Sequence, residues 1–314
     1  MSDSRIPLYL ITGFLDSGKT TLLYSRIKAR AEQGRRSILL VPEQFTSSTE
    51  GRIYRELGDA LSGMVESFSF TSLAERILSA EGGAAVQTLS DAGRAVLVRR
   101  ALEELQDHVH YYYRHRRSAA FCQMAAQTID ELKSAGLSGA QLAELAPDCG
   151  PESGKLSELA LIFQGYETLL AGTGMDPADR LELALARGEL PDFLREREVF
   201  IDEFDTFNAP KKRLMGAMLA ALPTVTVALC DDGAPMVPGD MGLFSGAKQV
   251  AAQLRQLARK NGADAAVPEL LRRDLRHKDA PGLAAVTELL ETGTCEVPPA
   301  APEVRLFAAA SREE

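Results

Sequence analysis

The segment that most constrains this fold is a glycine-rich loop near the amino terminus. Residues 13–20 read G-F-L-D-S-G-K-T and match the phosphate-binding pattern G-x-x-x-x-G-K-[S/T]. The loop follows the apolar run "PLYLIT" and precedes "TLLYSRIKARAEQG", whose apolar residues recur at helical spacing. A strand, this loop and a helix in that order predict an α/β domain of the P-loop NTPase class.

The residue types of the loop predict how a nucleotide is held. Glycines let the backbone turn its N–H groups toward the phosphates, and the start of the following helix adds the positive end of its dipole. Lys19 is expected to reach the β- and γ-phosphates, and the Thr20 hydroxyl is expected to ligate Mg²⁺. The residues predicted to bind the nucleotide here are Gly13, Asp16, Ser17, Gly18, Lys19, Thr20 and Thr21.

A second half of the site is predicted in "VFIDEF", residues 199–204. The apolar run ends in Asp202 and Glu203. Asp202 is expected to hold the magnesium, commonly through water, and Glu203 to orient or deprotonate an attacking water. The alternative is that the two acids only cap a strand. Loop and acid pair together predict ATP or GTP with Mg²⁺.

The remaining patterns predict a parallel sheet interrupted by helices. Short runs rich in Val, Ile and Leu at 7–13, 37–43, 199–204 and 224–232 are typical of strands covered on both faces. Between about 85 and 190 the pattern is helical, with segments that begin at Ser90 and Ser118 and one that ends at Gly136. We predict a motor-like domain from 1–84 and 191–292, a helical subdomain inserted at 85–190, and a linker with the start of a further domain at 293–314.

Composition excludes several classes of protein. The 314 residues are 45% hydrophobic, and no apolar run approaches the ~20 residues that span a bilayer. The amino terminus lacks the features of a signal peptide, so we expect a cytoplasmic protein without membrane contact. The four cysteines have no CxxC spacing and predict reduced thiols. The net charge of −9 argues that any DNA contact is local.

Two family resemblances bear on the function. The opening loop, I-T-G-F-L followed by S-G-K-T-T-L-L, is similar to that of CobW-type metallochaperone GTPases, but neither a CxCC run nor a guanine-reading N/T-K-x-D loop is present. The rest resembles AddB, also called RexB, of the bacterial ATP-dependent helicase-nucleases. This resemblance rests on "LLVPEQFT" at 39–46, "VESFSFTSLAERIL" at 65–78, "FIDEFDTFN" at 200–208 and "VRLFAAASREE" at 304–314, in family order.

The AddB resemblance implies a RecA-like fold of the superfamily 1 helicase type, with ATP and Mg²⁺ as cofactors. It implies a fragment that lacks most of a second motor domain and the nuclease, whose iron-sulfur cluster is expected outside this chain. It further implies an AddA-type helicase-nuclease partner, action on single- and double-stranded DNA ends in recombinational repair, and recognition of a Chi sequence with weak or no motor activity. A working DNA-dependent ATPase motor is the alternative, and a nucleotide-stabilised scaffold for the partner is a third.

The sequence departs from the helicase pattern in two places, and a third position is ambiguous. No glutamine precedes the first strand, and "CDDGAPMV" has the acidic pair of motif III without its glutamine. Arg276 in "LLRRDLRHKD" fits the position of an arginine that contacts the γ-phosphate, but a solvated charge run accounts for it equally well. The missing motif III glutamine puts the coupling of hydrolysis to DNA movement in question. The missing glutamine before the first strand leaves the base preference resting on the family resemblance.

Two sets of residues are candidates for DNA contact. Thr46, Ser47 and the serines at 67 and 69 are small polar residues at expected helix starts, where they suit phosphate binding or simple helix capping. The run "HVHYYYRHRR" at 108–117 interleaves aromatic and basic side chains, as single-stranded DNA binding requires. An exposed helix end is the alternative for this run.

Overall fold

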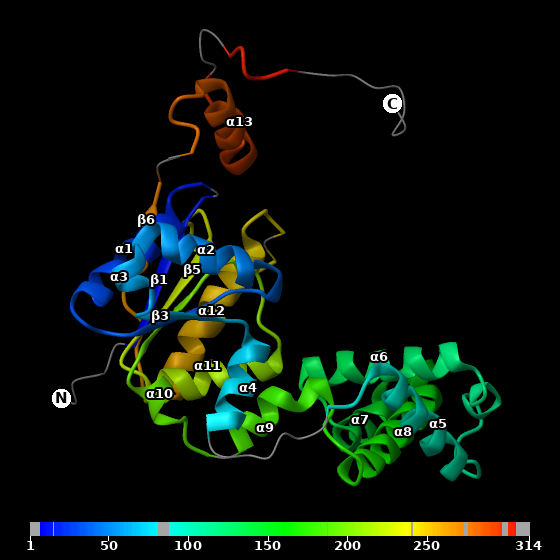
Figure 1. The fold of residues 1–314 in the computed structure, drawn as a ribbon. Coiled ribbons are helices and arrows are strands. Elements are labelled where there is room, and N and C mark those ends of the chain that lie inside the picture. Colours follow the sequence, from blue (N-terminus) through cyan, green and yellow to red (C-terminus); the bar gives the residue numbers. More distant parts are fainter. Residues whose placement is uncertain are drawn as a thin grey trace. The chain divides into compact units, whose positions relative to one another are not determined.

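The computed structural model describes residues 7–14, 16–80, 88–186, 188–239, 241–272, 276–296 and 301–305. These residues form two compact units, which are described separately (Figure 1). The sheet unit comprises residues 1–69, 193–206 and 218–314, and the helical unit comprises 70–192 and 207–217. Because this division reflects compactness alone, the domain boundaries expected from the sequence stay a prediction. No helix in the described ranges is both long and apolar enough to span a bilayer.

The sheet unit is built on six parallel strands. They are β1 (Leu8–Gly13), β2 (Ser37–Leu40), β3 (Val65–Phe68), β4 (Glu198–Ile201), β5 (Val225–Cys230) and β6 (Glu269–Leu271), in the order β3-β2-β4-β5-β1-β6. The predicted α/β fold with a RecA-like parallel sheet is confirmed. The order puts β5 between β1 and β4, so the two halves of the predicted nucleotide site follow strands that are not neighbours.

The four inner strands, β1, β2, β4 and β5, are mostly buried on both faces, which explains their largely apolar sequences. Ile11, Leu39 and Phe200 pack in one cluster with residues of α1 (Lys19–Glu32) and α2 (Thr46–Leu57). Their neighbours Leu10 and Ile38 point to the opposite face and are equally buried. The unit's other helices are α3 (Asp59–Ser62), α12 (Ser245–Lys260) and α13 (Pro281–Thr292), while α10 (Asp192–Arg195) and α11 (Ala209–Ala221) belong partly to each unit.

One strand of the sheet was not predicted from the sequence, and one predicted strand lies mostly outside the described residues. The strand β6 was not predicted, because three residues flanked by proline and arginine carry no periodic signal. The predicted strand at 304–314 falls mostly on residues 306–314, which lie outside the described residues, and residues 304 and 305 are not in a strand.

The helical unit contains α4 (Phe70–Ala80), α5 (Asp91–Glu104), α6 (Ala119–Ala135), α7 (Gly139–Leu145), α8 (Ser153–Ala171) and α9 (Arg180–Ala186). The predicted caps are confirmed. Ser90 accepts a hydrogen bond from the N–H of Gly93 at 3.2 Å, and Ser118 accepts one from Phe121 at 3.3 Å. Helix α6 ends at Gly136, whose φ of 85° is left-handed. The helices α5, α6 and α8 share one apolar core around Ile162, Phe163 and Tyr166.

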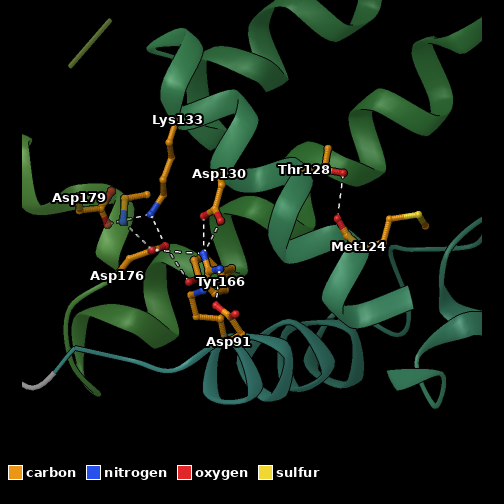
Figure 2. Close-up of polar contacts among 10 residues, drawn as sticks. Asp91, Met124, Thr128, Asp130, Lys133, Tyr166, Asp176 and Asp179 are labelled. Carbon is orange, nitrogen blue, oxygen red and sulfur yellow. Dashed lines mark hydrogen bonds and ion pairs between the residues drawn. The ribbon is translucent and has the colours of Figure 1, made fainter. Parts of the chain in front are cut away.

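A polar network is buried beside that core (Figure 2). Asp176, which is fully buried, accepts hydrogen bonds from Lys133 Nζ at 2.9 Å and from the Tyr166 hydroxyl at 2.8 Å. Its other oxygen lies 3.5 Å from Arg94 Nη1, and Arg94 also pairs with Asp130. Burial raises the pKa of Asp176, but the hydrogen bond and the positive charge of Lys133 lower it by more, so the net shift is downward. The network therefore holds Asp176 ionised inside the helical unit.

Candidate functional site

The glycine-rich loop joins β1 to the start of α1. Gly18 takes a left-handed φ of 89° at the cap position of α1, where no described side chain caps the helix. A side chain at Gly13 would meet the carbonyl oxygen of Leu271 at 2.4 Å and Ser17 Oγ at 2.5 Å, so this approach requires glycine. Ser17 Oγ is buried and has no hydrogen-bond partner within the described ranges. An uncapped helix start and an orphaned hydroxyl fit a phosphate group as ligand.

Lys19 lies folded over the loop. Its Nζ donates to the carbonyl oxygen of Gly13 at 3.0 Å and to that of Phe14. The Gly13 carbonyl also accepts from the N–H of Asp231, the first residue after β5, at 3.0 Å. Thr21 is exposed in the first turn of α1. The ammonium group of Lys19 is thus hydrogen-bonded to backbone carbonyl oxygens of the loop. A phosphate would compete successfully for it, because a hydrogen bond between two charged groups is stronger.

The two halves of the predicted site meet at Thr20 and Asp202. The Thr20 side chain lies close enough to the Asp202 carboxylate to lower its pKa, although β5 separates their strands. Asp202 is only 5% exposed, and its backbone N–H donates to Leu40 in β2 at 3.1 Å. Burial is the main cause that raises the pKa of Asp202 to about 6, and the neighbouring charge of Glu203 adds to it. A hydroxyl beside a buried, desolvated carboxylate is an oxygen pair that fits Mg²⁺.

Glu203 differs from its neighbour in both exposure and backbone. Its side chain is exposed, and its φ of 64° is left-handed, which is rare for a residue other than glycine. The N–H of Glu203 donates to Asp202 Oδ1 at 3.0 Å, and this bond stabilises the unusual turn. The turn directs two consecutive carboxylates to different surroundings, one buried and one in solvent.

Arg276 lies at the loop, and its expected contact with the γ-phosphate stays a prediction. Its Nη1 donates to Asp16 Oδ1 at 3.0 Å, and Asp16 itself has a left-handed φ of 61°. The arginine side chain is 70% exposed, so the pair contributes little to stability. Arg276 is nevertheless a second cation close to the glycine-rich loop.

Two further basic residues were missed by sequence analysis. Lys248 of α12 is buried and bonded to Asp232 at 3.0 Å, beside Asp231. Burial raises the pKa of Asp231, and the Lys248 bond outweighs burial to lower that of Asp232. Arg52 of α2 lies 4.8 Å over the Tyr24 ring and acts electrostatically on Asp202. Both lie in helices without a motif, so only the tertiary fold brings them to the site.

The raised pKa of Asp202 predicts that its ionised carboxylate lowers the free energy of unfolding at neutral pH. The folded chain keeps this proton up to about pH 6, whereas an unfolded chain releases it near pH 4. The folded state thus binds more protons between these values, and the free energy of unfolding falls as pH rises through them. In EDTA, Asp202→Asn should raise the free energy of unfolding at pH 7 by up to about 3 kcal/mol, and by less at pH 4.5.

Urea unfolding at the two pH values measures this effect. The matched control is Asp205→Asn, which alters an exposed carboxylate three residues further along and should change little. A less stable Asp202→Asn variant at pH 7 would contradict the expected cost of the buried charge.

The candidate DNA-contacting residues are divided between the units. Thr46 begins α2 and donates to the carbonyl oxygen of Glu43, and Ser47 is exposed in the same turn. Ser67 lies in β3, and Ser69 follows that strand and is buried. The 108–117 run belongs to the helical unit, between α5 and α6.

Comparison with known proteins places the chain in a family. Residues 10–287 match the family model described as "ADDB, N-terminal". The relative from Desulforudis audaxviator is 33% identical, over 97% of this chain and 27% of the relative. Those from Symbiobacterium thermophilum and Moorella thermoacetica are 31% and 33% identical, over 97% and 80% of this chain and 28% and 23% of the relatives.

All three relatives are named as the B subunit of an ATP-dependent helicase/deoxyribonuclease. This chain spans about a quarter of the length of these relatives. The family model matches most of the chain, which shows that this chain belongs to the AddB family, the B subunits of the ATP-dependent helicase/deoxyribonucleases.

Proposed function

We propose that this chain is the ATP-binding, DNA-contacting amino-terminal part of an AddB protein in a two-subunit helicase-nuclease. The complex would act in the cytoplasm on DNA ends during recombinational repair, with an AddA-type helicase-nuclease as partner. The observation that carries the nucleotide part is the placement of Thr20 beside the buried Asp202, next to an uncapped glycine-rich loop. The family match removes the support for a metallochaperone.

The residues of the loop have distinct parts in the proposed site. Lys19 and the loop N–H groups bind the phosphates, and Arg276 joins them once it leaves Asp16. Thr20 and Asp202 would hold Mg²⁺, which supplies charge neutralisation at the phosphate oxygens. Glu203, exposed beside Asp202, orients a water and accepts its proton.

We assign this part of the complex mainly to recognition of single-stranded DNA and of Chi, with weak or no motor activity of its own. Support comes from the acidic pair at 231–232, which lacks the glutamine that follows it in helicase motif III. Asp232 is instead paired with the buried Lys248. An active DNA-dependent motor is the second candidate, and the exposed Glu203 on its left-handed turn favours it.

DNA-stimulated ATP turnover by the full-length complex distinguishes these two functions. The partner's own P-loop lysine is replaced first, so that only the AddB protein can hydrolyse ATP. We expect slow turnover that single-stranded DNA changes little. Fast DNA-stimulated turnover would contradict recognition as the main role and support the motor.

In the same complex, Glu203→Gln should lower whatever turnover remains by about 10²-fold or more, because the amide accepts no proton. ATP binding should be unchanged, since the exposed Glu203 side chain is assigned to the attacking water and not to the phosphates. The neighbouring Asp205→Asn is the control for the loss of an exposed charge. Equal loss in both variants would show that charge near the site matters and the position of Glu203 does not.

A further inference from the structure

The helical unit has a pocket that the nucleotide site does not use. Its volume is about 450 Å³, within the range of roughly 300–1,000 Å³ typical of small-molecule pockets. Its lining residues come from the loop after α5, the first turns of α6 and the start of α8. Figure 1 labels these three helices. Its lining includes Tyr111, Tyr112, Arg114, His115, Phe121 and Lys155. All of it belongs to one compact unit.

The loop that presents these side chains is fixed by a buried carboxylate. Glu158 of α8 is 6% exposed and accepts from three consecutive backbone N–H groups. The donors are His110 at 2.8 Å, Tyr111 at 2.8 Å and Tyr112 at 3.3 Å. A carboxylate held by three N–H groups is well satisfied in the interior. The loop is therefore organised before any ligand arrives, which reduces the entropy lost on binding.

The aromatic rings of the pocket are arranged in a stack. The Tyr112 and Phe121 rings lie 5.7 Å apart at 26°, and His115 lies 5.4 Å from Phe121 on a tilted plane. Tyr111 is 56% exposed. An exposed ring beside an ordered stack offers a flat apolar face to a further planar group.

The charges at the pocket indicate which kind of planar ligand it would bind. Arg114 and Lys155 line it, and none of the described lining residues is a carboxylate. Lys155 is paired with Glu152 at 2.8 Å, so Arg114 supplies the clearer positive charge. Arg116 stacks 3.9 Å over the Tyr113 ring just outside the lining. Stacking faces with cations and without acids suit an unpaired nucleobase and its phosphate, because a base inside a duplex has no free face.

We propose that this pocket binds a base of single-stranded DNA, with Tyr111 stacking on the base and Arg114 contacting the adjacent phosphate. The inference rests on the proposed DNA-contacting function and locates one contact in the helical unit. It explains why a buried carboxylate holds the backbone of His110, Tyr111 and Tyr112 beside the pocket.

The test is equilibrium binding of a fluorescent single-stranded dT 20-mer to the 314-residue chain, measured by anisotropy. A second probe has the same backbone with abasic sites in place of the bases. Wild type should bind dT more tightly than the abasic strand. Tyr111→Ala should lose about 5- to 100-fold in affinity for dT and should no longer distinguish the two probes. Arg114→Ala should lower the salt dependence by about one counterion.

The matched control is Tyr54→Ala on α2, because Tyr54 is 57% exposed and lies in the sheet unit. It should bind both probes as wild type does. Equal binding of dT and abasic strands by wild type, or unchanged binding by Tyr111→Ala, would overturn the pocket and favour a protein side chain as its occupant. Failure of the chain to bind either strand would overturn the DNA part of the proposed function as well. Stabilisation by Mg-ATP reports separately on the nucleotide part.

Discussion

Asp176→Ala is expected to destabilise the helical unit by about 3–5 kcal/mol, the usual cost of removing one partner from a buried ion pair. The carboxylate is fully buried. It accepts hydrogen bonds from Lys133 and Tyr166 and forms an ion pair with Arg94 (Figure 2). Its loss leaves two buried cations with fewer partners and one tyrosine hydroxyl without its acceptor. Desolvated donors of this kind have no compensating bond to water.

Hydrogen exchange measured by mass spectrometry can locate this effect in the chain. Amides in α6 and α8 should exchange at least about 100-fold faster in the variant. Asp91→Ala is the control within the same network, because Asp91 also pairs with Arg94 but its side chain is 88% exposed. That variant should change exchange very little. Unchanged amide exchange rates in Asp176→Ala would mean that the buried network adds no stability to the helical unit.

Lys19→Ala is expected to abolish the stabilisation of this chain by Mg-ATP. In wild type, ligand at about a hundredfold excess over its dissociation constant should raise the free energy of unfolding by about 2.7 kcal/mol. The lysine side chain is held directly on carbonyl oxygens of the loop, ready to exchange them for phosphate. Thermal unfolding with and without Mg-ATP measures the difference.

The control for this variant is Lys28→Ala, which removes an exposed lysine from the same helix α1. It should keep the full nucleotide-dependent shift. Equal loss of the Mg-ATP-dependent stabilisation in Lys28→Ala and Lys19→Ala would mean that positive charge in general explains nucleotide binding. A specific site at the loop would then not be supported. A full shift in Lys19→Ala would place the nucleotide elsewhere.

The sequence predicted the parts of the fold that local patterns determine. Four of the six strands were predicted within a few residues, since strands buried on both faces are continuously apolar. The helix boundaries at Ser90, Ser118 and Gly136 were predicted because caps are chemical signals in the chain itself. The short edge strand β6 has neither signal, and its pairing with β1 is a tertiary event.

The candidate site divides in the same way. The loop and the acid pair at 202–203 follow strands, so their meeting at one edge of the sheet could be expected from parallel topology. The burial that separates Asp202 from Glu203 could not be predicted, because it depends on how the strands and helices around them pack. Arg52 and Lys248 come from helices of ordinary composition, and only packing gives them their partners.

Equilibrium dialysis of labelled ATP against the 314-residue chain, with Mg²⁺ present, tests the proposed nucleotide site most directly. We expect close to one ATP bound per chain, with binding weakened by Asp202→Asn and lost in Lys19→Ala. Removal of Mg²⁺ should weaken binding to wild type more than to Asp202→Asn, because that carboxylate is the proposed metal partner. The absence of bound ATP in wild type, or binding that neither substitution reduces, would contradict a nucleotide site built on Lys19 and Asp202.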